Sequence, residues 1–341
     1  MTGPIRIGIV GAGGIVRSEH VPRFRAIEGV KLVAVANRSP ESSRRAAKEL
    51  GIPRAVDDWR SLVADPGIDA VLVGAWPYLH APVTIAALEE GKHVLTEARM
   101  AATADDARAM LKTSLNHPDL VAMVVPSSFS LWADATIEKT LRAGSIGRVR
   151  HVRVGWDTSG PGDPSQFWRS QRRFSGQNVM ALGICYEAMA RWFGEARAVT
   201  AETRLGEPLR PGPSGPVPAD VPDHLLALID FPDDVTATLE MSARTNAVES
   251  NRATFYGTDG TLRVDFGAQR IDRALVGKDW KPVQVREKDR AGWTAEIDFV
   301  AAIRGEKEVT LTDFATGVAY MAFVEAVDRS AAIGKRVPVR P

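Results

Sequence analysis

The sequence predicts an α/β protein of two domains: a doubly wound parallel sheet, followed by an α/β domain with a mostly antiparallel sheet. Three observations lead to this prediction. The chain has 341 residues, which suits two domains of roughly 100 to 200 residues each. Its first 120 residues or so alternate β-branched runs with helical patterns, and a glycine-rich turn directly follows the first run.

The composition is that of an ordinary globular protein, with 45% hydrophobic and 25% charged residues. Lys and Arg number 43 against 42 Asp and Glu, so no net field attracts nucleic acid or an acidic membrane. We expect a small-molecule partner instead. The single Cys185 cannot form an internal disulfide, the start MTGPIRIGIV leads straight into a strand, and no apolar run reaches the roughly 18 residues of a membrane helix. We therefore expect a cytoplasmic protein.

The first half contains five β-branched runs at the spacing of βαβ units, which predicts a parallel sheet. The helix expected over residues 40–50 has the clearest boundaries, because Ser39 suits the N-cap, Pro40 the first position and Gly51 the position past the end. The predicted strands are Ile5–Val10, Leu32–Ala36, Ala70–Gly74, His93–Thr96 and Val121–Val125.

The turn after the first strand resembles a dinucleotide fingerprint, because its glycines let backbone amides approach a pyrophosphate at a helix N-terminus. The alternative is a plain glycine-rich turn, although its position after an N-terminal strand favours the fingerprint. Val16 occupies the third small position, so we expect either the helix to lie slightly farther from the sheet or the cofactor to be shifted. The residues expected to bind cofactor here are Gly11, Ala12, Gly13, Gly14 and Ile15.

Asn37, Arg38 and Ser39 follow the second strand, where the ribose is recognised. No acidic residue stands there to bind a 2′-hydroxyl and repel a 2′-phosphate, whereas Arg38 and Ser39 could hold that phosphate. We therefore expect NADP in preference to NAD. The alternative is that Arg38 only packs over the adenine or is solvated at the surface.

The second half contains alternating runs typical of half-buried strands in an antiparallel sheet. The turn signal of residues 257–260 joins the last two. Six prolines in residues 204–222 predict a loop, because proline has no N–H to donate to a ladder. The expected strands are Leu225–Phe231, Val235–Met241, Arg252–Tyr256 and Thr261–Phe266.

The chain resembles the Gfo/Idh/MocA family along nearly its whole length. The segments that carry the resemblance are GIVGAGGIV, ALEEGKHVLTEARMA (87–101), LRAGSIGRVRHVRV (141–154), FYGTDGTLRVDF (255–266) and FVEAVDRSAAIGKRV (323–337). The resemblance implies a Rossmann domain over residues 1–122 and a substrate-binding and oligomerisation domain over residues 123–341. It also implies an open sheet in the second domain, through which a homodimer or homotetramer would form. The implied activity is hydride transfer between NAD(P) and a sugar- or cyclitol-like substrate.

Three positions depart from the family's pattern. The Glu-Lys-Pro motif reads Glu97-Ala98-Arg99, and the family's Asp and His positions on a later helix fall on Ala181 and Cys185. The usual acid and base groups are therefore absent, and alanine can handle no proton. From the same junction, the resemblance implies cofactor contacts from Ala75, Trp76, His80 and Glu97.

Four residues are candidates to replace the lost catalytic groups: His80, Arg99, Tyr186 and Glu187. His80 could serve as an acid or base, or only cap the following helix. The guanidinium of Arg99 cannot be a base but could bind a carboxylate or stabilise an oxyanion, or else pair with Glu97. Glu187 stands four residues before Arg191, which favours a simple helix-surface pair.

A second group of residues is expected to contact substrate. Trp156, Trp168 and Arg169 could form a flat wall for a sugar ring or pack in the core. Asn178 could contact substrate or cap a helix, and Cys185 could face the site or only fill space left by an imidazole. The full set is Arg99, Ser127, Trp156, Trp168, Arg169, Asn178 and Cys185, and the six scattered His residues with one Cys predict no metal site.

The sequence therefore predicts an NAD(P)-dependent oxidoreductase. One alternative is a lyase, epimerase or glycoside-cleaving enzyme that retains its cofactor. The other is a non-catalytic protein that binds a dinucleotide or another ligand.

Overall fold

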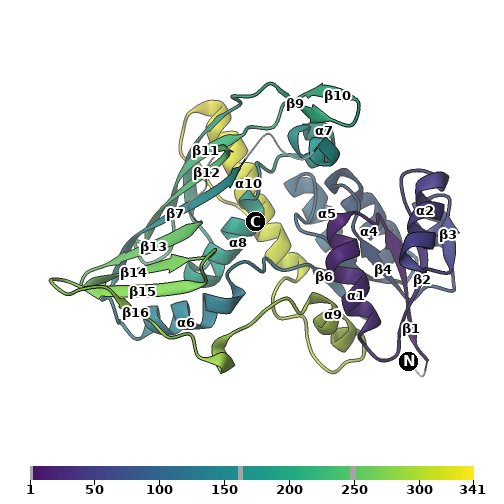
Figure 1. Cartoon of the computed structure of the whole chain (residues 1–341), viewed down its shortest axis with the longest axis horizontal. Helices are drawn as coiled ribbons and strands as arrows, with labels where there is room; N and C mark the ends of the chain where they lie inside the picture. The colour runs from purple at the N-terminus through teal and green to yellow at the C-terminus, as the bar shows by residue number, and fades with distance from the viewer. Residues whose placement is uncertain (1–2, 160–163, 246–250) are drawn as a thin grey trace. The chain divides into compact units, whose positions relative to one another are not determined.

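The computed structural model describes residues 3–159, 164–245 and 251–341 (Figure 1). The chain divides into two compact units, residues 1–126 with 294–321 and residues 127–293 with 322–341. The first change of unit lies a few residues beyond the expected boundary at 122. The return of residues 294–321 to the first unit has no counterpart in the division made from the sequence.

The first unit contains a six-stranded sheet with the order β3-β2-β1-β4-β5-β6. Every pairing in it is parallel, so the predicted doubly wound sheet is confirmed. The order reverses between β1 and β4, and ligands of such sheets bind beyond the carboxyl ends of the strands at this point. The strands are β1 (Ile5–Val10), β2 (Val30–Ala36), β3 (Arg54–Val56), β4 (Ala70–Val73), β5 (His93–Thr96) and β6 (Ala122–Val124).

Helices connect these strands. The predicted helix α2 (Pro40–Leu50) is confirmed, with the Ser39 hydroxyl accepting from Ser42 N and Gly51 ending it at φ +57°. After the glycine turn the chain forms a π-helix, η1 (Val16–His20), a form that occurs mostly as single turns at functional sites. The others are α1 (Val21–Arg25), α3 (Trp59–Val63), the 3₁₀ helix η2 (Pro77–Leu79), α4 (His80–Glu89), α5 (Ala104–Leu115) and α9 (Ala295–Ile303).

Val16, the residue at the third small position of the turn, is accommodated by Gly74. Val16 is fully buried, and a Cβ built at Gly74 would lie 2.2 Å from its Cγ2 atom. In the usual fingerprint a small residue on the helix leaves room for the sheet. Here the residue without a side chain is Gly74, at the end of the neighbouring strand β4. The valine is therefore compatible with close packing of helix and sheet.

The second unit contains a nine-stranded sheet with the order β16-β15-β14-β13-β7-β12-β11-β8-β17. Only β7 and β12 pair in parallel, and the sheet is otherwise antiparallel, as predicted. The expected turn over residues 257–260 joins β13 to β14. The strands are β7 (Val149–Ser159), β8 (Ala198–Arg204), β11 (His224–Asp230), β12 (Thr236–Thr245), β13 (Arg252–Gly257), β14 (Gly260–Asp265), β15 (Arg270–Leu275), β16 (Lys281–Pro282) and β17 (Val337–Pro338).

Helices α6, α8 and α10 lie on one side of this sheet (Figure 1). Aromatic rings fill the layer between them, with Trp192 of α8 5.3 Å from Phe255 of β13 between centroids. The helices are α6 (Leu131–Arg142), η3 (Pro164–Ser170), α7 (Arg172–Ser175), α8 (Leu182–Phe193), η4 (Glu287–Asp289) and α10 (Phe314–Ile333), of which α10 begins in the first unit. Among the described residues no helix is long and apolar enough to cross a membrane.

The prediction of a loop over residues 204–222 is wrong in part. Strands β9 (Leu209–Gly212) and β10 (Gly215–Pro218) form a two-stranded hairpin there. Its prolines fall on alternate pairs, Pro211 opposite Pro216 and Pro218 opposite Leu209. The pairs Arg210–Val217 and Gly212–Gly215 contain no proline and keep their N–H groups. A short, isolated two-stranded ribbon therefore tolerates the prolines.

Candidate functional site

The glycine turn has the shape of a phosphate cradle. Gly11 has φ +89°, and a Cβ there would lie 2.5 Å from the backbone of Ala75, so only glycine fits. A Cβ at Gly14 would meet nothing within 4 Å, and one at Gly13 only Gly74 O at 3.9 Å. The open side of this turn, at the switch point of the sheet, fits the pyrophosphate of a dinucleotide.

The segment after β2 is held in place by its own hydrogen bonds. Asn37 Oδ1 accepts from Ala12 N at 2.8 Å, and its amide donates to Ser42 O at 3.1 Å. The Ser39 hydroxyl serves as the cap of α2. The Arg38 guanidinium carbon lies 5.8 Å from the centre of the Trp76 ring, so two residues expected at the cofactor lie beside each other.

His80 begins α4 and is buried. Its Nδ1 lies 2.8 Å from Arg99 O and its Nε2 2.9 Å from Ala75 O, so both ring nitrogens face backbone carbonyls. Burial lowers the pKa of His80 more than these carbonyls raise it. The imidazole joins the ends of β4 and β5, and its expected catalytic role stays a prediction.

A buried cluster of His20, Glu97 and Glu296, which the sequence analysis did not identify, lies in the first unit. His20 Nε2 lies 2.6 Å from Glu97 Oε1, and His20 Nδ1 lies 2.6 Å from Glu296 Oε1. Burial alone lowers the pKa of His20, but the carboxylates of Glu296 and Glu97 outweigh it and raise the pKa to about 9. The imidazole is therefore an imidazolium at neutral pH, held between two carboxylates.

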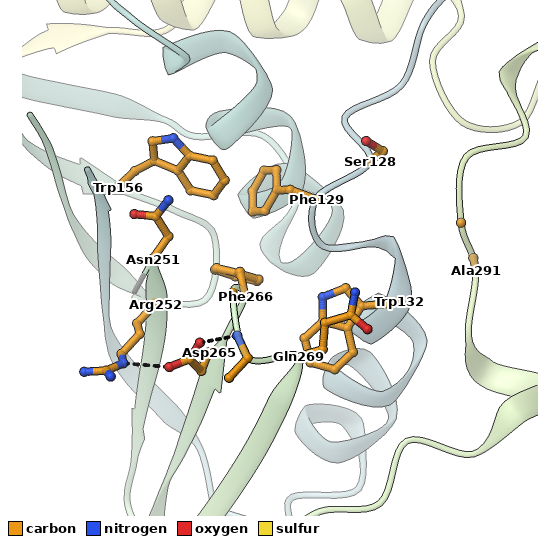
Figure 2. A pocket seen from close by; sticks show the side chains of 13 residues that line it. Ser128, Phe129, Trp132, Trp156, Asn251, Arg252, Asp265, Phe266, Gln269 and Ala291 are labelled. Atoms are coloured by element: carbon orange, nitrogen blue, oxygen red, sulfur yellow. Dashed lines mark hydrogen bonds and ion pairs between the residues drawn. The ribbon is translucent and has the colours of Figure 1, made fainter. Parts of the chain in front are cut away.

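The second unit contains a pocket of about 640 Å³. Figure 2 shows Trp156 and Phe129 with their rings close together and Phe266 below them. The Phe129 centroid lies 4.5 Å from that of Trp156 and 5.0 Å from that of Phe266. These three rings form an aromatic wall. Trp156 was expected at the substrate, whereas the other two were not identified from the sequence.

Polar groups from β13 and β14 complete the pocket. Arg252 Nε donates to Asp265 Oδ2 at 3.0 Å, which Figure 2 marks, and Asn251 Oδ1 accepts from Asp157 N at 2.7 Å. Sequence reasoning missed these residues. The signal in the sequence was an Arg at the start of one predicted strand and an Asp near the end of the next, which an antiparallel hairpin places opposite each other. Ser128 and Gln269 also line the pocket.

Helix α8 places the expected residues Cys185 and Tyr186 in the core of the second unit. Cys185 is 1% exposed, and burial raises the pKa of its thiol. Burial likewise raises the pKa of Tyr186 to about 12. The Tyr186 hydroxyl accepts from Ala196 N at 2.8 Å, and its ring stacks on Phe323 at 3.8 Å. These contacts favour packing roles, and a catalytic role for Tyr186 stays untested.

Glu187 belongs to a buried polar network rather than to a helix surface. Its carboxylate accepts from Arg191 Nη1 at 2.8 Å and from Ser127 N at 3.1 Å. Arg191 also donates to Ser127 O at 2.9 Å and to Asp134 at 2.9 Å. The spacing correctly predicted the ion pair, but its burial fastens α8 to the start of α6. Ser127 takes part through its backbone.

The structure does not place the remaining substrate candidates on the aromatic wall. Asn178 precedes α8. Its side-chain oxygen accepts from Gly183 N and its side-chain nitrogen donates to Met180 O, both at 2.8 Å, so the side chain stabilises the first turn of the helix. The Arg169 guanidinium carbon lies 4.5 Å from the Trp168 ring centre, and neither residue is among those that line the pocket. In the described part of the chain, no group of His, Cys, Asp and Glu could hold a metal ion.

The parallel sheet, the order of its strands and the glycine cradle define a dinucleotide-binding protein. Comparison with known families agrees, because residues 5–125 match the oxidoreductase family with an NAD-binding Rossmann fold, and residues 135–263 match the GFO/IDH/MocA C-terminal domain. The chain belongs to the Gfo/Idh/MocA family of oxidoreductases.

Individual relatives cover nearly all of the chain. Levoglucosan dehydrogenase of Pseudarthrobacter phenanthrenivorans is 28% identical over 99% of this chain and 91% of its own length. Inositol 2-dehydrogenase of Acidothermus cellulolyticus is 27% identical over 86% of this chain and 82% of its own length. A solved levoglucosan dehydrogenase in complex with NADH and levoglucosan has a TM-score of 0.83 at 24% identity, with 99% of both chains covered. That structure shares the fold.

Proposed function

We propose that this protein transfers a hydride between a nicotinamide dinucleotide and a sugar- or cyclitol-like substrate. The observation that carries the proposal is the glycine cradle, open at Gly13 and Gly14, in a chain whose two halves both match an oxidoreductase family. The names of the relatives above support the substrate class. When bound, the cofactor supplies the ring carbon that accepts or returns the hydride.

We place the substrate ring in the pocket of the second unit. The wall of Trp156, Phe129 and Phe266 suits the C–H face of a sugar, because aromatic rings offer a flat apolar surface. Ser128 and Asn251 supply polar groups at its margin. A role for Arg99 in binding an anionic group stays a separate proposal, because the residue is 7% exposed and its guanidinium stays protonated and can stabilise an oxyanion.

We propose NADP as the preferred dinucleotide, although a solved relative holds NADH. Arg38 supports this, since it follows β2 beside Trp76 and no carboxylate stands at residues 37–39. Ser39 is committed to capping α2, so Arg38 alone would bind the 2′-phosphate. Arg38→Ala should weaken NADPH about tenfold or more and NADH little, whereas Arg44→Ala on the exposed face of α2 should change neither. Equal weakening of both would refute the preference.

A different enzyme class is the second candidate. Alanine stands at residues 98 and 181 and a buried thiol at Cys185, where the family pattern described in the sequence analysis implies proton-handling groups. A lyase or epimerase that retains its cofactor would need a different proton-handling set from a net oxidoreductase. If substrate were converted while the cofactor ended unchanged in redox state, this class would replace the first.

The deciding experiment combines binding with turnover. Purified protein is titrated with NAD, NADP, NADH and NADPH by thermal shift, and then assayed at 340 nm against levoglucosan, myo-inositol and simple aldoses. A change in absorbance with any of these supports the proposal. Binding of a dinucleotide and of a polyol without turnover would indicate a binding protein, and no dinucleotide binding would refute the proposal.

We also propose a homodimer or homotetramer formed through the nine-stranded sheet. Strand β11 alternates buried and exposed residues, and Leu226 and Leu228 are each 49% exposed on the outward face. Light scattering of Leu226→Asp should then show smaller particles than the wild type.

A reducing, cytoplasmic location remains part of the proposal and rests on the single Cys185.

A further inference from the structure

We propose that Glu97, held by His20 and Glu296, takes up the substrate's hydroxyl proton in place of the lysine that Ala98 replaces. Glu97 is then the catalytic residue, and His20 and Glu296 are positioning residues. The inference rests on the proposed function, because it names the proton acceptor for that hydride transfer.

The three side chains come from three separate parts of the first unit. His20 ends the π-helix η1, Glu97 follows β5, and Glu296 lies in the first turn of α9. Both nitrogens of His20 lie 2.6 Å from a carboxylate oxygen, one of Glu97 and one of Glu296. The imidazole therefore fixes the direction of the Glu97 side chain.

Only one member of the cluster is accessible. The side chains of His20 and Glu296 are 0% exposed, whereas that of Glu97 is 13% exposed. Glu97 also lies just past the carboxyl end of β5, its amide donating to Val73 O at 2.9 Å. Parallel sheets bind ligands at this edge, so a proton from a ligand would reach the cluster through Glu97.

With His20 as an imidazolium, the two carboxylates that contact it leave the cluster a net charge of −1. Both nitrogens of His20 are already engaged, so an additional proton must go to a carboxylate oxygen. His80 and Arg99 belong to the same surroundings, since His80 interacts electrostatically with both Glu97 and Arg99.

The other groups at this edge are poor acceptors. Both ring nitrogens of His80 face carbonyl oxygens, and the Arg99 guanidinium stays protonated. Glu97 is thus the accessible group beside Ala98 that can gain a proton.

The step balances. The alcohol O–H bond breaks and its proton passes to Glu97, while the hydride leaves the same carbon for the oxidised dinucleotide. The carbon–oxygen bond becomes a carbonyl. Glu97 later returns its proton to water, so one alcohol and one oxidised cofactor give one carbonyl compound, one reduced cofactor and one proton.

The test compares three variants, Glu97→Gln, Glu97→Asp and Glu296→Gln, with the control His117→Gln. His117 precedes β6 and so lies at the amino ends of the parallel strands, whereas Glu97 lies at their carboxyl ends. Glu97→Gln should lower single-turnover hydride transfer by about 10²- to 10⁴-fold. The rate is measured at saturating dinucleotide, so that a change in cofactor affinity, which is expected because Glu97 is also a predicted cofactor contact, does not enter it. Glu97→Asp should recover part of the rate, and Glu296→Gln, which leaves the Glu97 carboxylate in place, should lower the rate less than Glu97→Gln does. The control should resemble wild type.

Hydride transfer at the wild-type rate in Glu97→Gln would overturn the proposal. A folded Glu296→Gln that is as slow as Glu97→Gln would also overturn it, because the loss would then not depend on the Glu97 carboxylate. A wild-type protein that binds dinucleotide but oxidises no polyol would count against the proposed function instead. A titration of the His20 imidazole by nuclear magnetic resonance, which needs no substrate, then decides: a His20 pKa that falls in both Glu97→Gln and Glu296→Gln supports the pairing on which the proposal rests, and an unchanged one refutes it.

Discussion

Gly74→Ala tests how this chain accommodates a valine in the glycine turn. A Cβ at position 74 would lie 2.2 Å from Cγ2 of Val16 and 2.7 Å from Gly11 O. Favourable contacts between carbon atoms are about 3.5–4.0 Å, so the buried Val16 and the turn would both have to move. Gly74 is not in the left-handed region, so the expected penalty is steric rather than conformational.

Overpacking of this kind costs about 1–3 kcal/mol of folding free energy. One kcal/mol corresponds to roughly 2–4 °C in the melting temperature of a unit of this size, so we expect a fall of about 2–12 °C. Val16→Ala alone should also destabilise, by about 1–3 kcal/mol, because it leaves a cavity. In the double variant the clash with Cγ2 disappears and only that with Gly11 O remains, so the two costs should not add.

The assay is thermal denaturation of the four proteins of the cycle, followed by circular dichroism. We expect the double variant to be at least about 1 kcal/mol more stable than the sum of the single effects predicts. Gly14→Ala is the control, since a Cβ there meets nothing within 4 Å and the melting temperature should not change. Additivity within about 0.5 kcal/mol would show that Val16 is not what Gly74 accommodates.

Three further predictions follow from the contacts described above. Gly14→Ala should weaken dinucleotide binding about tenfold or more by calorimetry while the fold is kept, because its methyl group enters the phosphate cradle; unchanged affinity would place the phosphates elsewhere. The pKa of His20 is raised to about 9 from 6.5, so its stabilisation should be fully present below pH 6.5 and lost as the pH rises through 9. In urea unfolding, the advantage of wild type over His20→Gln should therefore shrink by roughly 3 kcal/mol across that window, and a constant difference would contradict the pairing. Tyr186→Phe removes the bond from Ala196 N and should cost about 1 kcal/mol of stability without changing kcat; a tenfold fall in kcat would instead support the catalytic role expected from the sequence.

The sequence by itself determined the layout of the first sheet and the class of ligand. β-Branched runs, helix caps such as Ser39 and the conformational demand on Gly11 are local properties, readable from neighbouring residues. The replacement of the expected lysine by Ala98 is equally visible in the sequence. These features predicted a dinucleotide-binding sheet, and the resemblance to the Gfo/Idh/MocA family added the oxidoreductase activity.

Only the tertiary structure decided how the side chains pair. His20 forms an ion pair with Glu296, although most of the chain separates the two residues in sequence. Val16 packs where Gly74 has no side chain, and the Glu187 carboxylate accepts a hydrogen bond from the backbone of Ser127. Helical spacing predicted the pair of Glu187 with Arg191 but could not show its burial. The physical reason is that periodicity and capping depend on residues a few positions apart, whereas burial and charge pairing depend on which elements the fold brings together.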